Sequence, residues 1–416
     1  MLVRILRRAS IYWLSLASMA AQAPDASISI PAKLSHTVEG FLLIPVQVNG
    51  VLFSCNPDSG GSSGFSLDAK RGRLAGFKPD STGQSAGAEP DVISDQRMRG
   101  ATLKIGNIIL RDQTVVMRPF PSEASDMDCV LGLGLLRNYV VELDYTTPSV
   151  RLFHPSGFVP DPKASVIPFH LDRNNPVADV TFAFRDGYRL DASLVLDTGA
   201  AYYSAALIPS VIARSAISSH ARSTAKRPNR SKGTGGEISI AATRPLAIRI
   251  GPIQQDNPVV GLVQGESAGI PWDGLLGTGF FQGFTATFDY NAGKLFLKPN
   301  AHARDLQPFD ASGLGFRRDS DTGVYSVDIV LPDTPAALAG LSKGDLLVSL
   351  DGRKAEILTP IEIRRRLSRP GTDCEIVIRR DGLDRGLYCD WRRVYDVSAR
   401  MNDTLPISQC ELAQQL

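Results

Sequence analysis

Two short motifs in this sequence each contain an aspartate that could act in acid–base catalysis. Residues 194–196 form an apolar run typical of a buried strand, and residues 197–199 directly after it read Asp-Thr-Gly. Residues 58–60, Asp-Ser-Gly, end a similar segment upstream. A carboxylate at the end of a buried strand costs free energy unless something uses it. A single Asp-Thr-Gly is also typical of an ordinary Asx turn, so the hypothesis of an active site depends on the second copy.

Two carboxylates within hydrogen-bond distance could hydrolyse an amide. Neighbouring carboxyl groups cannot both ionise cheaply, so Asp58 and Asp197 would share one proton and titrate as a pair. The ionised member would take a proton from a bound water, and the protonated member would donate to the carbonyl oxygen of the substrate. The motifs therefore predict general acid–base hydrolysis without a covalent intermediate.

The residues that follow each acid suit such a pair. Ser59 and Thr198 carry hydroxyls that could brace the opposite turn. Gly60 and Gly199 have no side chain, so the backbone can approach a carboxylate closely. We expect these four residues to support the two catalytic loops.

An internal repeat indicates that the two motifs are equivalent. Residues 103–106, 128–132 and 142–145 each match a segment 145 positions later without gaps. The two acids are 139 positions apart, so the second copy has six additional residues between its acid motif and its later turn. Each copy consists of short strands with turn residues between them, which predicts an all-β fold. Two copies facing each other about a pseudo-two-fold axis would bring Asp58 and Asp197 together.

Both copies become polar and glycine-rich after the acid motif, at residues 80–87 and 226–236. We expect exposed loops that act as mobile flaps over a cleft. Lys226, Arg227 and Arg230 make the second loop basic, which could favour acidic peptides. The basic run has no interleaved aromatic residues, so it does not predict nucleic-acid binding.

Other acids recur in both copies without a following Ser/Thr-Gly. We expect them to be structural acids of turns and strand ends: Asp128, Asp144, Asp273 and Asp289. The five histidines are scattered, and the chain has neither a His-Glu-x-x-His zinc pattern nor a GxxxxGK phosphate loop. We therefore expect no metal and no cofactor.

Bulk composition excludes two classes of partner. Lys and Arg number 45 against 43 Asp and Glu in 416 residues, so the net charge is only +2. Such a balance does not predict nucleic acid or an anionic membrane as a partner.

Residues 1–23 have the basic start, short apolar stretch and small residues of a secretory signal peptide, with a cleavage site after Ala20. An uncleaved anchor helix is the alternative, although the apolar run is short for a membrane span. We expect an exported protein, periplasmic or secreted, with no stable membrane span after signal removal.

The five cysteines leave two possibilities open. Cys55 could pair with Cys129, and Cys374 with Cys389, in an oxidising compartment, which leaves Cys410 over. Five free thiols are equally compatible with the sequence, because sequence does not fix disulfide geometry.

A different module follows residue 299. Its pattern is that of a small α+β domain of about 90 residues, and the tail at 397–416 is polar. The expected elements are strands at 324–330, 374–380 and 386–391, a turn, a strand and a second turn within 343–352, and helices at 334–341 and 361–367.

The acid turns, the flap-like loops and the later apolar-apolar-glycine segments resemble the retropepsin-like, pepsin-related aspartic proteases, duplicated here in one chain. Gly132 and Gly277 match the second glycine element of that family. The resemblance implies a mainly β fold in which two homologous retropepsin-like β-barrel halves, at 35–155 and 165–299, form one bilobal acid-protease unit. It also implies an extended peptide as substrate and one catalytic pair, Asp58 and Asp197.

The first copy departs from this family. Asn56 and Pro57 precede its acid where apolar residues are usual, and Gly61 follows where the family has a small residue other than glycine. The second copy fits better. The chain is therefore predicted to be an exported aspartic endopeptidase. The alternative is a catalytically degenerate protein that only binds peptides.

Residues 308–396 resemble a PDZ domain of the kind attached to exported bacterial proteases. In that family a short loop holds the C-terminal carboxylate of a peptide, and the strand after it accepts the peptide as an added strand. The residues that match the loop are Gly313, Leu314, Gly315 and Phe316. The resemblance implies that this domain recruits peptide or unfolded-protein substrates. A PDZ-like packing module that binds no free terminus is the alternative.

Overall fold

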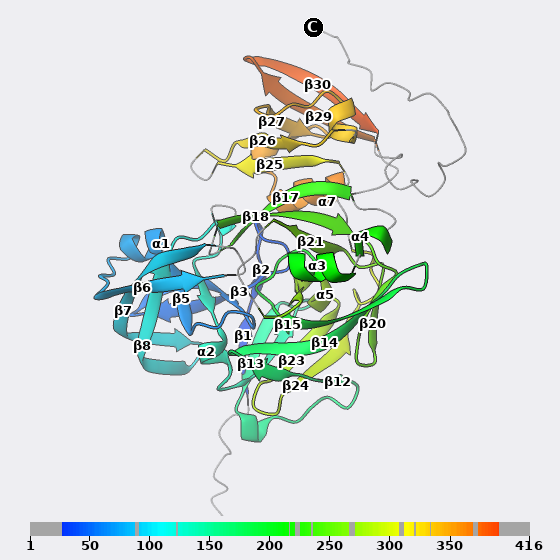
Figure 1. Ribbon diagram of the computed structural model, residues 1–416. Helices are drawn as coiled ribbons and strands as arrows, with labels where there is room; N and C mark the ends of the chain where they lie inside the picture. The colour runs from blue at the N-terminus through cyan, green and yellow to red at the C-terminus, as the bar shows by residue number, and fades with distance from the viewer. Residues whose placement is uncertain are drawn as a thin grey trace, which may run out of the picture.

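The computed structural model of this chain is mainly β, with two β-rich halves and a smaller domain of strands and short helices (Figure 1). The predicted signal segment and the polar tail lie outside the described residues. The structure describes residues 27–87, 91–121, 124–215, 217–220, 225–233, 236–265, 271–307, 312–319, 322–332, 334–368 and 373–390.

The first half is an eight-stranded sheet in the order β2-β3-β4-β9-β5-β8-β7-β6. Its elements are β2 (Lys33–Leu34), β3 (Leu42–Val48), β4 (Val51–Pro57), β5 (Phe65–Asp68), α1 (Ala69–Leu74), β6 (Ser81–Ala86), β7 (Val92–Ile105), β8 (Ile108–Arg118), β9 (Cys129–Leu131) and α2 (Leu133–Leu136).

The second half repeats this order as β13-β14-β15-β22-β16-β21-β18-β17, with β19 and β20 beyond β14. The repeat predicted from the 145-residue offset is therefore present in the topology. Its elements are β13 (His170–Asp172), β14 (Asn175–Ala183), β15 (Arg189–Leu196), β16 (Ala205–Leu207), α3 (Pro209–Ser215), α4 (Ile217–His220), β17 (Ala225–Gly233), β18 (Gly236–Thr243), β19 (Ala247–Ile250), β20 (Ile253–Asp256), β21 (Val260–Gln264), β22 (Gly274–Leu276) and α5 (Thr278–Phe281).

The polar segments expected as loops are hairpin strands instead. β6 pairs with β7, and β17 pairs with β18. The prediction failed because a sheet-edge hairpin is held by backbone hydrogen bonds and needs no apolar alternation. Residue exposure along β6 alternates between half-buried and exposed, so neither face of this strand is buried in the core.

A third sheet joins the halves in the order β1-β11-β10-β23-β24-β12. At its centre Glu142 lies directly opposite Thr287, and the threonine hydroxyl donates to the carboxylate at 3.3 Å. These residues are 145 positions apart, so the pseudo-two-fold axis passes between them. The strands are β1 (Ser27–Pro31), β10 (Val140–Asp144), β11 (Ser149–Phe153), β12 (Ser165–Pro168), β23 (Phe284–Asp289) and β24 (Lys294–Pro299).

One apolar cluster extends through both halves and the joining sheet. Phe65 in the first half and Phe182 and Phe288 in the second are among its fully buried side chains. Burying each such side chain stabilises the fold by about 1.5–3 kcal/mol. The shared core holds the two halves in one fixed arrangement.

A disulfide joins Cys55 to Cys129, which confirms that predicted pairing. It links β4 to its parallel neighbour β9. Cys374 is buried and lies opposite Cys389 in the register of two neighbouring strands. The side chain of Cys389 and all of Cys410 lie outside the described residues, so the second pairing stays a prediction.

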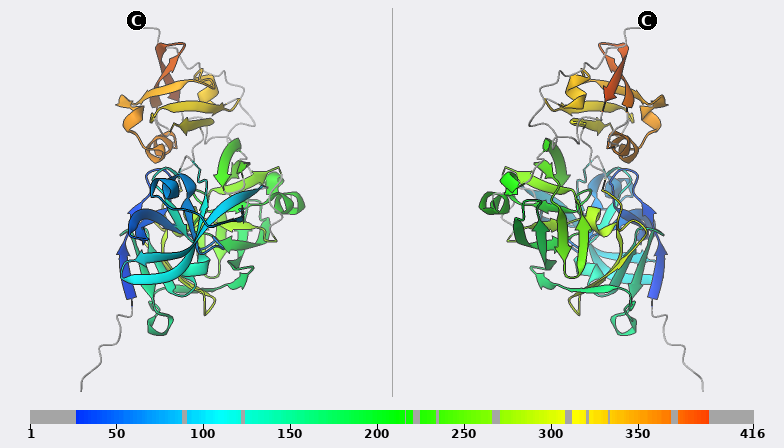
Figure 2. Two further views of the ribbon diagram at one scale, coloured as in Figure 1. Left: turned by 90° about the vertical axis from the view of Figure 1, so that its left-hand side faces the viewer. Right: turned by 90° about the vertical axis from the view of Figure 1, so that its right-hand side faces the viewer.

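The C-terminal domain has its own sheet, β25-β26-β27-β29-β30, and its own apolar core. It stands at one end of the two halves (Figure 2). In the described part of the chain, no helix is long and apolar enough to cross a membrane. The elements are β25 (Leu314–Arg318), β26 (Tyr325–Val330), α6 (Pro335–Leu338), β27 (Leu346–Leu350), β28 (Arg353–Lys354), α7 (Pro360–Leu367), β29 (Asp373–Arg380) and β30 (Leu383–Asp390).

Candidate active site

The two acids occupy matching positions at the ends of matching strands. Asp58 follows β4 and Asp197 follows β15. The Asp58 N–H donates to the carbonyl of Leu131 at 2.8 Å, and the Asp197 N–H donates to that of Leu276 at 2.9 Å. Each turn is therefore fixed by the neighbouring strand of its own half.

The two turns meet so closely that only glycine fits beside each carboxylate. A Cβ atom at Gly60 would lie 2.4 Å from the carboxyl carbon of Asp197, and one at Gly199 would lie 2.4 Å from that of Asp58. The two carboxyl groups hydrogen-bond to each other. The structure thus brings together the acids and both glycines predicted to surround them.

The hydroxyls of the two motifs cross between the halves. Ser59 Oγ donates to the carbonyl of Leu196 at 2.7 Å, and Thr198 Oγ1 donates to that of Pro57 at 2.9 Å. Each hydroxyl also accepts the backbone N–H of the other, at 3.0 Å. Ser59 and Thr198 are both buried, so this four-bond brace is shielded from water.

Burial raises the pKa of both carboxyl groups. The pKa of Asp197 lies well above its usual range, because the negative charge of Asp58 adds to the effect of burial. For Asp58, hydrogen bonds from Asp197 and from the N–H groups of Gly61 and Gly60 oppose the effect of burial on its pKa. The pair therefore shares one proton, because two neighbouring carboxyl groups cannot both ionise cheaply.

This raised pKa makes a prediction about stability and pH. A carboxyl group whose pKa is higher in the folded state contributes stability that is complete below its ordinary pKa of about 4. That stability is lost as the pH rises through the raised pKa of Asp197. Because asparagine does not titrate, Asp197→Asn should have a higher Tm than wild type at pH 7, and the difference should shrink towards pH 4.

Differential scanning calorimetry between pH 4 and pH 7 measures this effect. Asp144→Asn is the control, since Asp144 accepts the N–H groups of Thr146 and Thr147 in a surface turn. A Tm difference for Asp197→Asn that does not change with pH would contradict the predicted linkage.

The unusual residues before Asp58 leave its geometry intact. Pro57 has no N–H, but its carbonyl accepts the hydroxyl of Thr198 as the carbonyl of Leu196 accepts that of Ser59. Asn56 is buried in β4, and among the described residues its side-chain nitrogen has no hydrogen-bond partner. The first half therefore presents its acid as the second half does.

Gly132 and Gly277 let the helices that follow them pass close to the two acid turns. A Cβ atom at Gly132 would lie 2.1 Å from the carbonyl oxygen of Ser63, and one at Gly277 would lie 2.6 Å from that of Ala200. Both positions precede short helices, α2 and α5. No larger residue fits at either place.

The recurring acids hold turns and strand ends. Asp128 accepts the Ser54 N–H at 2.9 Å, and Asp273 accepts the Ser193 N–H at 3.0 Å. Both acids also form ion pairs, with Arg71 and Arg214 respectively. Asp144 and Asp289 likewise accept backbone N–H groups in turns.

A serine pattern lies beside the first acid but lacks the partners of a nucleophile. Residues 60–64 fit Gly-x-Ser-x-Gly, a pattern that in serine hydrolases joins a strand to a helix. Here the segment leads from β4 into another strand, β5. Ser63 shares a hydrogen bond with Ser66, and within the described residues no histidine hydrogen-bonds to Ser62 or Ser63.

The predicted peptide-binding loop lies at one edge of the C-terminal sheet. Gly313 has φ +74°, and a Cβ atom there would lie 2.2 Å from Thr334 Oγ1. Leu314 is buried, and its N–H donates to Ser312 Oγ at 3.0 Å, so this N–H is already engaged. β25 contains Gly315 and Phe316, and among the described strands it pairs only with β26. Its other edge is therefore available for an added strand.

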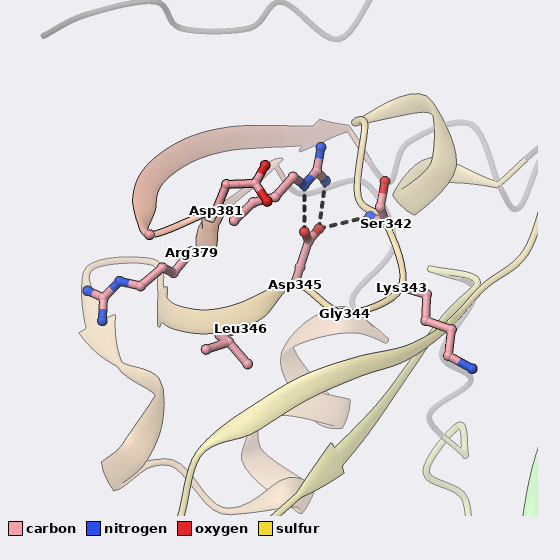
Figure 3. Close-up of a pocket in the computed structure, with 9 residues that line it drawn as sticks. Ser342, Lys343, Gly344, Asp345, Leu346, Arg379 and Asp381 are labelled. Atoms are coloured by element: carbon pink, nitrogen blue, oxygen red, sulfur yellow. Dashed lines mark hydrogen bonds and ion pairs between the residues drawn. The ribbon is translucent and has the colours of Figure 1, made fainter.

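The same domain has a separate recess of about 640 Å³, between residues 342–346 and the hairpin at 379–382. Figure 3 shows the side chains that line it. Asp345 is 1% exposed there and accepts two hydrogen bonds from Arg380, at 2.7 and 2.8 Å. Ser342 N–H donates to the same carboxylate at 2.8 Å. These charges neutralise each other, so we assign this recess a structural role.

Comparison with known proteins identifies the C-terminal domain. Residues 327–380 match the PDZ domain family, within the range of 308–396 predicted for it. The serine protease HTRA1 of Xenopus tropicalis is 33% identical over 66 residues, and that of Xenopus laevis is 38% identical over 66 residues. Each match covers 16% of this chain and 14% of the relative's length. The chain therefore spans only a small part of these relatives.

Among solved structures, the chain is similar to the aspartic proteinase from Irpex lacteus. The TM-score is 0.45 with 11% identity, and the similarity covers 68% of this chain and 100% of the other. A similarity of this size carries no argument about activity. The comparisons therefore establish one family for part of the chain: residues 327–380 form a PDZ domain.

Proposed function

We propose that this chain is an exported aspartic endopeptidase, built from two retropepsin-like halves in one chain, with a PDZ domain that recruits protein or peptide substrates. The observation that carries the proposal is the reciprocal approach of two acid turns. Each carboxylate lies against the glycine of the opposite motif, and the acids are Asp58 and Asp197.

The geometry suits a division of roles between the two acids. The ionised member of the pair takes a proton from a water held between the carboxylates. The member that carries the shared proton donates it to the carbonyl oxygen of the scissile amide. The N–H groups of Gly60 and Gly199 hold one oxygen of the acid in their own turn, at 2.9 and 2.8 Å. These bonds fix the planes of both carboxylates.

Two further features support an extended peptide as substrate. The hairpins β6–β7 and β17–β18 occupy matching places in the two halves and are suited to act as flaps. The unpaired edge of β25 would accept a C-terminal or extended peptide by strand addition. No metal or cofactor enters the proposed reaction.

Cleavage of an unfolded protein between pH 3 and pH 8 tests the proposal. We expect internal cuts and a bell-shaped pH dependence, since one carboxyl group must be ionised and the other protonated. Mass spectrometry in ¹⁸O-labelled water should place one labelled oxygen in each new C-terminus. A protein that retains unfolded chains without producing new termini would instead be the peptide-binding alternative.

Export is a separate part of the proposal. It follows from residues 1–23 and predicts a mature N-terminus at Ala21. N-terminal sequencing of the expressed protein and fractionation of the cells measure it. A retained Met1 in the soluble cell interior would contradict it.

A further inference from the structure

The turn that carries Asp197 is extended by one residue relative to its counterpart. Gly134 N–H donates to the carbonyl of Ser63, and Gly279 N–H donates to that of Tyr203. Ser63 and Tyr203 are 140 positions apart, whereas the two acids are 139 apart. The second half therefore has one additional residue between its acid and this contact. The longer loop places Tyr202 in the left-handed region at φ +73°, a strained conformation for an aromatic residue.

A glutamine from outside the two halves holds this loop. Gln307 follows the last strand of the joining sheet and leads towards the PDZ domain. Its side-chain oxygen accepts Ser204 Oγ at 2.7 Å and the Val259 N–H at 2.8 Å. Its side-chain nitrogen donates to the carbonyl of Tyr202. Gln307 thus ties the strained Tyr202 to Ser204 and to Val259, the residue before β21.

The PDZ helix α7 contacts the same loop. The Arg364 guanidinium carbon lies 4.8 Å from the ring centroid of Tyr202. The next residue, Arg365, pairs at 3.7 Å with Glu39, whose side chain is 10% exposed. Figure 2 shows α7 on the side of the PDZ domain that faces the two halves. Both contacts come from one short helix.

These contacts reach the turn of Asp197 through hydrogen bonds. Thr278 Oγ1 donates to the carbonyl of Glu39 at 3.4 Å and accepts the Tyr202 N–H at 3.1 Å. Thr278 N–H donates to the carbonyl of Ala200 at 2.8 Å, and Ala200 N–H donates to that of Asp197 at 3.3 Å. The path from α7 to the acid is continuous.

We propose that Arg364 and Gln307 are positioning residues for the Asp197 turn, so that the PDZ domain forms part of the framework of the active site. The proposal rests on the proposed function for its catalytic consequence. The structural part stands on the contacts alone, because a longer and strained loop requires support that the shorter loop of the first half does not.

The test compares three full-length variants by hydrogen–deuterium exchange at the N–H groups of Tyr203 and Ser204, which bond to Ala201 and Val259. Arg364→Ala should raise exchange there roughly twofold to fivefold, as expected for a lost cation–π contact. Arg364→Lys keeps a cation over the Tyr202 ring, so exchange at these N–H groups should return to the wild-type rate. Arg379→Ala is the matched control, because Arg379 pairs with Asp384 in the hairpin of β29 and β30.

Unchanged exchange in Arg364→Ala, or an equal rise in Arg379→Ala, would overturn the positioning role whether or not the protein cleaves peptides. In the cleavage assay, Arg364→Ala should lower kcat with little change in KM. Absence of cleavage by wild type would contradict the proposed function, while the exchange result would still decide the positioning role.

Discussion

Asparagine in place of Asp197 is expected to lower kcat/KM for cleavage of an unfolded protein about 10²- to 10⁴-fold. The amide keeps the shape of the side chain and can still accept the Gly199 N–H, which bonds to the carboxylate at 2.8 Å. It cannot pass a proton to the substrate. The loss should therefore fall on chemistry rather than on folding, and steady-state kinetics with circular dichroism of the same sample measures both.

Asp58→Asn should lose activity to the same extent, because one carboxylate cannot supply both the acid and the base. Asp144→Asn is the matched control, since that acid recurs in the repeat and accepts two N–H groups of a turn, at 2.8 and 3.1 Å. Full activity in Asp58→Asn or Asp197→Asn would refute the assignment of the pair.

Removal of the disulfide between Cys55 and Cys129 should lower the free energy of unfolding more than any other substitution described above. Cys55 and Cys129 are 74 positions apart, and closing a loop of that length stabilises a protein by about 4 kcal/mol in the chain-entropy description. The double variant Cys55→Ala, Cys129→Ala should lose about this much free energy of unfolding in urea titrations. The bond also ties β4, which leads into Asp58, to β9, so activity should fall at temperatures where wild type is stable.

Wild type treated with a reductant under native conditions provides the comparison. It should approach the stability of the double variant, because both lack the same covalent link. A double variant as stable as the oxidised wild type would show that the shared core, rather than the disulfide, holds β4 in place.

The internal repeat made the meeting of the two acid turns predictable from sequence. A single Asp-Thr-Gly has an ordinary reading as a turn, but two copies in equivalent segments constrain each other. The brace between Ser59 and Thr198 followed from the same comparison, since each hydroxyl needed an opposite turn to reach. The roles of the acids remain a prediction that the variants above test.

Contacts without a local pattern could not be predicted. Gln307 lies in a segment with no repeat partner, and its side chain bonds only through the folded arrangement of Tyr202, Ser204 and Val259. The stacking of Arg364 on Tyr202 joins residues of two domains 162 positions apart in the sequence. Residues 80–87 and 226–236 were expected as loops because backbone pairing at a sheet edge leaves no apolar signal.

Glu142 and Thr287, which lie opposite each other at the centre of the joining sheet, affect how the two halves would associate if they were separate chains. A homodimer of the first half alone would place one Glu142 against another across the axis, where like charges directly opposite each other are destabilising. A homodimer of the second half would place two Thr287 hydroxyls there, which can bond to each other. If the two halves were produced as separate polypeptides, the first half should therefore prefer the second half to a copy of itself.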